Sequence, residues 1–173
     1  LAQGIAYAAS DRAYLYGLDA MYFAPRGLTT VTGFPYATIG HKAIKFAPWV
    51  DLFTKQLYFG DDGGYLYMID DTGTDQTGYP YQISTTAKIT STPMYVRGAG
   101  VVPIGADDGY LYFVDRNTGS GPNLFKRYFI TGSGSVSSVA YNNGVGAYMV
   151  ASSDGKLTFV KASDVADPTP SVE

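Results

Sequence analysis

A β-hairpin is predicted by the run Gly105-Ala106-Asp107-Asp108-Gly109-Tyr110-Leu111-Tyr112-Phe113-Val114-Asp115. Its turn dipeptide, Asp-Gly, has a glycine that adopts positive φ at little cost, and the aromatic and β-branched residues after it favour a strand. Side chains alternate along a strand, so the two tyrosines share one face while Leu111 and Phe113 share the other. Because neither face is polar, we expect neighbouring sheets to cover this strand on both sides.

The same hairpin recurs along the chain at a nearly constant spacing. Seven pairs of identical residues are 45 positions apart: Pro35 and Pro80, Pro48 and Pro93, Gly60 and Gly105, Gly64 and Gly109, Tyr65 and Tyr110, Tyr67 and Tyr112, and Asp70 and Asp115. A later repeat places Gly155, Leu157 and Phe159 46 positions after Gly109, Leu111 and Phe113. The first repeat, over residues 4–19, precedes the second by 51 positions, which assigns an insertion to residues 21–28.

A repeat of about 45 residues that holds four short strands is typical of a β-propeller blade. In the third repeat we expect strands over residues 89–96, 101–106, 110–115 and 125–131, and residues 42–51 should form a strand of the second repeat. Helical periodicity is missing, since Gly or Pro interrupts nearly every window of sufficient length. The expected fold is all-β and β-propeller-like, with about four blades over residues 1–166 and an extended tail or linker over 167–173.

The first and last blades are expected to be incomplete. The first begins at the strand equivalent to 101–106, and the last stops at the strand equivalent to 110–115. Both ends of the sheet array would then expose strand edges, unless the termini pair with each other, with another molecule, or with a strand of a partner protein. If the chain closes on itself, residues 1–10 and 162–173 should lie close in space.

Composition narrows the class of protein. The chain has 173 residues, a net charge of −3, 16 tyrosines and no cysteine, so it carries no basic footprint for nucleic acid and no disulfide. No apolar run approaches the roughly 20 residues of a membrane helix. A cysteine-free, tyrosine- and glycine-rich chain with few charges suits an extracellular, cell-surface or periplasmic protein.

A family resemblance follows from these residues. The run over 105–119 and Ser152-Ser153-Asp154-Gly155-Lys156-Leu157 resemble the blade motif of quinoprotein-like (PQQ-like) β-propellers, and the segments at Gly33 and Gly78 are similar to FG-GAP-like propeller repeats. The resemblance implies a propeller fold, in families that include enzymes, assembly factors, adhesins and scaffolds. Quinone enzymes usually have a docking tryptophan after the Thr-Gly of each motif. Here Asn123, Leu124 and Phe125 follow Gly119, and the single tryptophan, Trp49, belongs to a different strand.

Five aspartates recur at the hairpin tips: Asp61, Asp62, Asp107, Asp108 and Asp154. Carboxylates at one rim could bind a cation or act as acid and base, but Asp before Gly also caps a turn with its own side chain, and its presence in every repeat favours the turn role. Asp71, Gly73 and Asp75 come closest to a calcium loop, although the full EF-hand pattern is missing, so Ca²⁺ there is a weak alternative to no cofactor.

Other residue types indicate no catalytic site. His41 is the single histidine and is expected in a solvent-facing loop, without the further ligands of a transition-metal site. Ser133, Ser135, Ser137 and Ser138 lack the context of a hydrolase or phosphate-binding loop. Tyr65, Tyr67, Tyr110 and Tyr112 are expected to pack between blades, with hydroxyls reaching the surface or a partner. Tyr22, Tyr36, Tyr79, Tyr81 and Tyr141 lie in expected connectors, where exposed rings would suit a glycan or a protein interface.

These observations favour a non-catalytic extracellular or cell-envelope propeller that acts as a binding or structural module in a larger assembly. Its partner would be a protein or a second molecule that meets the terminal sheet edges, with a glycan as the alternative ligand. A periplasmic assembly factor is one alternative. A fragment of a quinone-dependent or carbohydrate-active enzyme is the other, which would require an acid pair or docking tryptophans.

Overall fold

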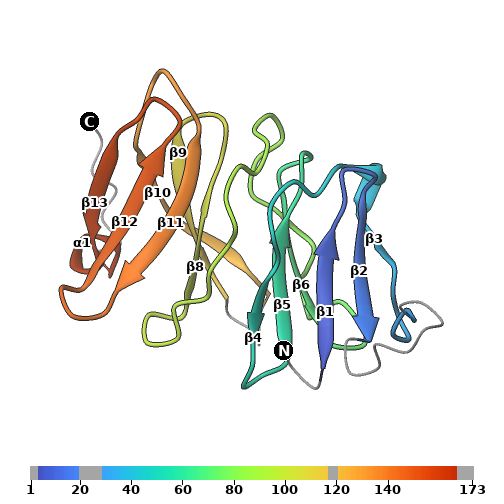
Figure 1. Ribbon diagram of the computed structural model, residues 1–173. Coiled ribbons are helices and arrows are strands. Elements are labelled where there is room, and N and C mark those ends of the chain that lie inside the picture. Colours follow the sequence, from blue (N-terminus) through green and yellow to red (C-terminus); the bar gives the residue numbers. More distant parts are fainter. Residues whose placement is uncertain (1–3, 20–28, 117–120, 167–173) are drawn as a thin grey trace.

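The computed structural model describes residues 4–19, 29–116 and 121–166 and contains four antiparallel sheets side by side (Figure 1). We call them blades 1 to 4 in chain order. Blade 1 contains β1 (Ile5–Ala9), β2 (Tyr14–Asp19) and β3 (Tyr36–Ala37), and blade 2 contains β4 (Trp49–Asp51), β5 (Gln56–Gly60), β6 (Tyr65–Asp70) and β7 (Tyr81–Gln82). Blade 3 contains β8 (Val101–Gly105), β9 (Tyr110–Asp115) and β10 (Asn123–Phe129), and blade 4 contains β11 (Val136–Asn142), β12 (Ala147–Ser152) and β13 (Leu157–Lys161).

The repeat spacing correctly predicts how the strands pair. Leu57 of β5 lies opposite Ile69 of β6, and 45 positions later Val102 of β8 lies opposite Val114 of β9. Within residues 4–19, 29–116 and 121–166, blade 1 has no first strand of the repeat and blade 4 has no last strand, as expected. Among the described residues, β1 pairs only with β2 and β13 only with β12. The β1 edge of blade 1 and the β13 edge of blade 4 are therefore open.

Each pair of neighbouring blades encloses one apolar cluster. Leu15, Phe59 and Tyr67 belong to the cluster between blades 1 and 2, and Met68 and Val102 to the cluster between blades 2 and 3. Phe113 and Tyr148 meet between blades 3 and 4, with their ring centroids 4.8 Å apart. The centres of blades 2 and 3 are therefore buried on both faces, which explains why their strands have no polar face.

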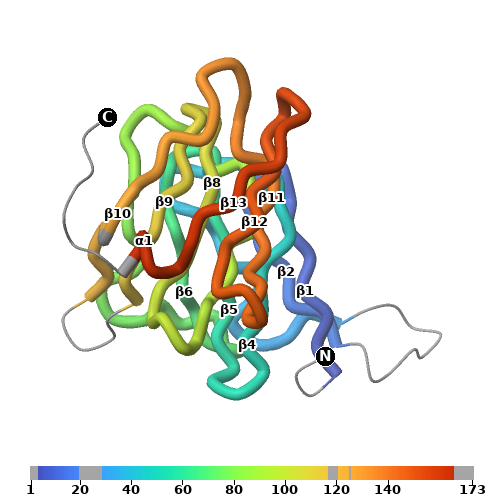
Figure 2. The backbone as a smooth tube through the Cα atoms, turned by 90° about the vertical axis from the view of Figure 1, so that its left-hand side faces the viewer, coloured from blue at the N-terminus to red at the C-terminus, as the bar shows by residue number. Residues whose placement is uncertain are grey.

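The four blades form an open array. Blade 1 and blade 4 lie at opposite ends in Figure 1, with blades 2 and 3 between them. In Figure 2, which looks along the array from the blade 4 end, β12 and β13 lie in front of the other sheets. Residues 4–10 and 162–166 are thus far apart, so the described chain does not close on itself.

Two expected strands are largely missing. Residues 89–96 form only the isolated bridges of Ile89 with Ala106 and of Val96 with Val101, because the Ser91 hydroxyl accepts the Gly105 N–H and Pro93 has no N–H to donate. In 42–51 only Trp49–Asp51 is a strand, since Ile44 donates its N–H to Ser10 of blade 1.

Helical turns are present, although none was expected. The 3₁₀ turn η1 (Ile39–His41) and the short helix α1 (Ala162–Ala166) both occur, and the latter buries Val165 against blade 4. Within the described ranges no helix has the length and apolar character needed to span a membrane. The expected insertion at 21–28 and the expected tail at 167–173 lie outside the described residues.

Candidate functional site

The aspartates at the hairpin tips form turn hydrogen bonds. Asp61 is buried, and its carboxylate accepts the N–H groups of Gly63 and Tyr65 at 2.8 and 3.0 Å and the hydroxyl of Tyr67 at 2.7 Å. Burial raises the pKa of Asp61, and the three donors oppose that rise. The Tyr67 hydroxyl is therefore used inside the protein, and the expectation that it reaches the surface is wrong.

In blade 3, Asp108 accepts the turn and tyrosine hydrogen bonds that Asp61 accepts in blade 2. Asp108 accepts the N–H of Tyr110 and the hydroxyl of Tyr112, while Asp107 accepts the N–H of Lys88 at 2.8 Å. Burial and the bond to Asp108 raise the pKa of Tyr112 to about 12. Each of these carboxylates thus fixes a turn or the entry of a neighbouring strand.

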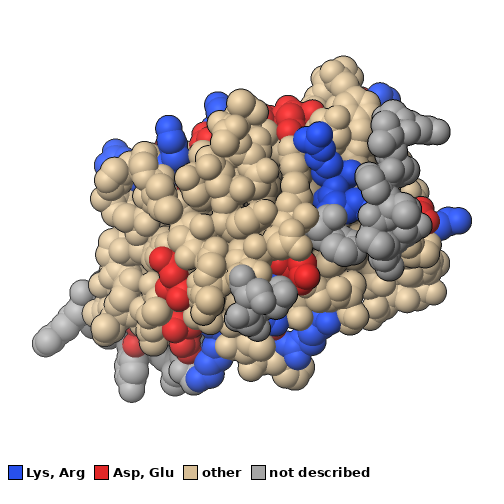
Figure 3. Space-filling model, turned by 180° about the vertical axis from the view of Figure 1, so that it is seen from behind, with Lys and Arg blue, Asp and Glu red and all other residues tan. Residues whose placement is uncertain are grey.

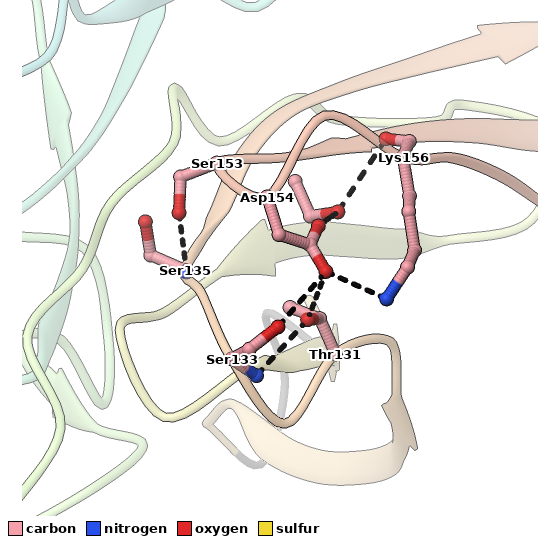
Figure 4. Close-up of polar contacts among 7 residues, drawn as sticks. Thr131, Ser133, Ser135, Ser153, Asp154 and Lys156 are labelled. Carbon is pink, nitrogen blue, oxygen red and sulfur yellow. Dashed lines mark hydrogen bonds and ion pairs between the residues drawn. The ribbon is translucent and has the colours of Figure 1, made fainter.

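Asp154 joins the last hairpin to the loop that enters blade 4 (Figure 4). Its carboxylate accepts hydrogen bonds from the hydroxyls of Thr131, Ser133 and Ser152 and pairs with Lys156 at 2.7 Å. The Lys156 ammonium, followed by the Ser152 and Thr131 hydroxyls, lowers the pKa of Asp154 well below its usual range. In this network Ser133 is a donor to a structural carboxylate.

This network makes acid stability depend on Asp154. A carboxyl group whose pKa is lower in the folded than in the unfolded chain stabilises the fold above the unfolded value, here 3.8, and loses that contribution as the pH falls through the folded value. We expect Asp154→Asn to lower the urea midpoint at pH 6, and the difference from the wild type to shrink below about pH 4. Urea unfolding at pH 6 and at a pH below about 4, followed by circular dichroism, measures this change. A difference in urea midpoint between the variant and the wild type that does not depend on pH would contradict the prediction.

The suggested calcium loop has its carboxylates directed to different partners. Asp75 accepts the hydroxyl of Tyr36 at 2.7 Å, and Asp71 pairs with Lys55 at 3.8 Å. Asp70 accepts the N–H groups of Thr72 and Thr74, both at 2.9 Å. Over the described ranges, no group of three or more His, Asp or Glu side chains is placed to hold a metal ion. Calcium at Asp71, Gly73 and Asp75 stays a prediction for direct titration.

The remaining sequence candidates lie apart. His41 is exposed in η1, and its ring centroid lies 6.4 Å from that of Tyr14. Ser135 donates its N–H to Ser153, and the Ser137 hydroxyl donates to the carbonyl of Ala151. Ser135 and Ser137 therefore hold the blade 4 strands in register. The structure does not bring His41 to either serine.

An arginine and aromatic cluster lies between blades 2 and 3. The ring of Tyr95 stacks on Tyr58 at 5.9 Å and meets Trp49 edge-on at 6.4 Å. Arg116 lies 4.5 Å from the centroid of the Tyr95 ring and donates to the side chain of Gln56. Cation–π contact and burial hold this guanidinium in place, so the single tryptophan packs on tyrosines within the protein.

One end of the array, at the bottom in Figure 1, carries exposed apolar side chains next to this cluster. We define the lower rim as residues 52–55, 97–100 and 143–146, the turns that lead into β5, β8 and β12. Phe53 is 84% exposed, Leu52 60% and Val145 69%. The guanidinium of Arg97 lies 4.0 Å above the Phe53 ring and pairs with the buried carboxylate of Asp51. Two turns from different blades are thereby locked together.

A hollow of about 390 Å³ opens beside the lower rim. It is lined by Gly98, Ala99, Val101, Asp115, Tyr148, Ala162 and Val165, so blades 3 and 4 and helix α1 all contribute. The backbone that carries Arg97 continues directly into its wall at Gly98. The lower rim thus combines a projecting aromatic ring, a cation and an adjacent apolar hollow, the features found at the centre of protein interfaces.

Sequence reasoning missed these lower-rim residues. Phe53 and Arg97 belong to turns of unlike sequence, so the repeat does not mark them, and their contact joins residues 44 positions apart. The available signal was a Leu-Phe pair in the turn between two predicted strands, where polar residues are usual. Charge gives little guidance, since Figure 3 shows acidic and basic side chains interspersed on a largely uncharged face.

Comparisons with known proteins describe the fold. No protein-family model and no curated protein matches the sequence. Among solved structures, the computationally designed Ika4 protein is similar with a TM-score of 0.65 and 13% identity, over 93% of this chain and 87% of Ika4. The designed Ika8 protein has a TM-score of 0.63 and 13% identity, over 92% of this chain and 43% of Ika8.

A natural protein has the same fold. BamB from Moraxella catarrhalis is similar with a TM-score of 0.62 and 15% identity, over 92% of this chain and 44% of BamB. The chain thus spans less than half of the length of Ika8 and of BamB, and most of the length of Ika4. At these identities the likeness concerns the fold alone, and this chain has the fold of a β-propeller, with four blades of which the first and last are incomplete.

Proposed function

We propose that this chain is a non-catalytic β-propeller module of the cell envelope or cell exterior, which binds a protein partner through its lower rim. The observation that carries the proposal is Phe53, an 84% exposed aromatic ring held in place by Arg97. An exposed large apolar side chain costs solubility, and rigid aromatic anchors next to an arginine are typical of binding hot spots.

The chemistry of the lower rim suggests the kind of partner. A partner segment with an apolar side chain would fill the hollow at Gly98 and Val165 and cover Phe53 and Leu52. A carboxylate on the partner would pair with Arg97, whose side chain is 49% exposed beside Asp51. Because Arg97 is already oriented by Asp51, the partner would order few side chains on binding.

A site-specific cross-link tests this proposal. We expect a photoreactive phenylalanine analogue at position 53 to cross-link one discrete protein in the source cells. The same analogue at position 129 is the matched control, because Phe129 is also exposed, at 60%, but lies in β10 away from the lower rim. Cross-linking at neither position, or equally at both, would contradict the proposal, and Arg97→Glu should abolish the specific product.

The likeness to BamB favours one form of this proposal, in which the propeller is a periplasmic assembly factor. In that case the cross-linked protein would be a component of an envelope assembly. The enzyme alternative has a separate test, since a bound quinone cofactor would appear as a saturable absorbance change on titration.

A further inference from the structure

A polar hollow of about 330 Å³ opens at the end of blade 2 opposite the lower rim. One lower-rim turn leads into β5, whereas the turn over residues 61–64 follows β5, so the two turns lie at opposite ends of that strand. The turn over 61–64 lies at the top in Figure 1, and we call the hollow beside it the upper pocket. Its polar and aromatic lining residues are Lys42, Asp62, Tyr65, Gln82, Thr85 and Thr86.

Blade 2 has a polar residue where blade 3 has an aromatic ring against its hairpin tyrosine. Tyr65 and Tyr110 are equivalent in the repeat. The ring centroids of Tyr110 and Phe129 are 5.3 Å apart, and the guanidinium of Arg127 lies 4.8 Å from the Tyr110 ring centroid. Phe129 pairs with Tyr110 across β9 and β10. Gln82 pairs with Tyr65 in the same way, so in blade 2 an amide replaces the covering ring and Tyr65 borders the upper pocket.

The walls of the upper pocket are held by hydrogen bonds within the protein. The hydroxyl of the buried Thr38 donates to the carbonyl oxygen of Lys42 at 2.7 Å and accepts the N–H of the same residue at 2.9 Å. The side-chain amide of Gln82 donates to the carbonyl oxygen of Gly63 at 3.4 Å. Since these contacts fix the backbone of Lys42 and orient Gln82, few groups lose conformational freedom when a ligand binds.

The lining of the upper pocket favours an uncharged ligand with many hydroxyl groups. One lysine and one aspartate line it, so the charges of the lining residues balance. The Lys42 ammonium provides only hydrogen-bond donors and the Asp62 carboxylate only acceptors, while the Gln82 amide and the two threonine hydroxyls provide both. Asp62 also pairs with Lys45 at 2.7 Å, which orients its carboxylate.

A sugar ring has the complementary chemistry. Its hydroxyl groups both donate and accept hydrogen bonds at the edge of the ring, and its C–H groups form an apolar face. The negative face of an aromatic ring such as that of Tyr65 attracts those C–H groups, while the hydroxyl groups reach the polar side chains around it.

We propose that the upper pocket binds a neutral sugar unit, with a C–H face on the ring of Tyr65 and hydroxyl groups bonded to Lys42, Asp62 and Gln82. The pocket is distinct from the lower rim, and the inference goes beyond the proposed function. Its volume of about 330 Å³ lies at the small end of the range for ligand pockets, which suits the terminal unit of a glycan rather than an extended chain.

Nuclear magnetic resonance tests the proposal with the methyl glycosides of glucose, galactose, mannose and N-acetylglucosamine. We expect at least one of them to receive saturation transferred from the protein, with a dissociation constant on the order of 1 mM, because a single sugar unit makes few contacts. Tyr65→Ala should weaken this binding about tenfold. Tyr110→Ala is the matched control, since it removes the equivalent ring of blade 3, and it should leave the dissociation constant unchanged.

A second variant tests the pocket without removing a ring. Gln82→Phe gives blade 2 the residue that covers the tyrosine in blade 3, and it should also abolish binding. Circular dichroism would show that each variant folds. No transfer to any of the four glycosides, equal losses at positions 65 and 110, or undiminished binding by Gln82→Phe would each overturn the proposal. The cross-link at position 53 does not depend on these variants, so the two proposals fail separately.

Discussion

Replacing Gly109 by alanine is expected to lower the free energy of unfolding by about 3 kcal/mol, whereas the same change at the equivalent Gly155 should cost only about 1 kcal/mol. Both glycines have positive φ, 81° and 83°, so the conformational cost of a side chain is shared. They differ in their neighbours. A Cβ on Gly109 would lie 1.8 Å from the carbonyl oxygen of Thr131, while a Cβ on Gly155 has no atom within 4 Å.

The difference has a structural cause. The Gly109 carbonyl accepts the N–H groups of Ile130 and Thr131, so the chain leaving β10 closes over this turn. Blade 4 lacks the corresponding last strand, which leaves the turn at Gly155 open. Blade 1 has Ala13 at this position with φ of 72°, so a methyl group alone is tolerated in the conformation.

Urea unfolding of the two variants measures this prediction under identical conditions. The wild type and Ala13→Gly serve as references, and the latter should be slightly stabilising because glycine relieves the left-handed cost. Equal losses at positions 109 and 155 would show that the contact with Thr131 has no energetic weight.

Replacing Asp61 by alanine should cost about 3 kcal/mol, because the buried carboxylate accepts two N–H groups and the hydroxyl of Tyr67. Removing it leaves these donors unsatisfied inside the protein. The neighbouring Asp62 is the matched control, since it forms only a partly exposed ion pair with Lys45 at 2.7 Å, and Asp62→Ala should cost less than about 1 kcal/mol.

Asp61→Asn separates shape from charge. The amide keeps one acceptor oxygen in the same place and carries no charge. In the wild type, burial of the charged carboxylate raises the pKa of Asp61. We expect a smaller loss than for alanine, measured as the shift in the urea midpoint at pH 7. A loss at Asp62 equal to that at Asp61 would contradict the structural role of the buried carboxylate.

The sequence could predict the blades because the repeat carries their pairing. The equal spacing of Gly64 and Gly109, and of Tyr67 and Tyr112, reflects two sheets with the same register. Period-2 apolar residues also predicted burial on both faces, as found for Phe113 on one face and for Tyr112 and Val114 on the other.

What the sequence could not predict depends on contacts between segments that are distant in the chain or meet only in the folded protein. The strand expected over 89–96 is replaced by two bridges because the Ser91 side chain takes a backbone partner. Helix α1 forms where Val165 finds an apolar surface on blade 4, which local propensity does not report. Arg97 and Phe53 meet only once blades 2 and 3 have stacked, so no local pattern marks the lower rim.

The open array also has a consequence for cooperativity. Four blades in a line share three interfaces, each between chain neighbours, so the energy of the molecule resembles that of a one-dimensional array. Inner blades are held on two sides and terminal blades on one, so unfolding should begin at blades 1 and 4 and reach blades 2 and 3 last.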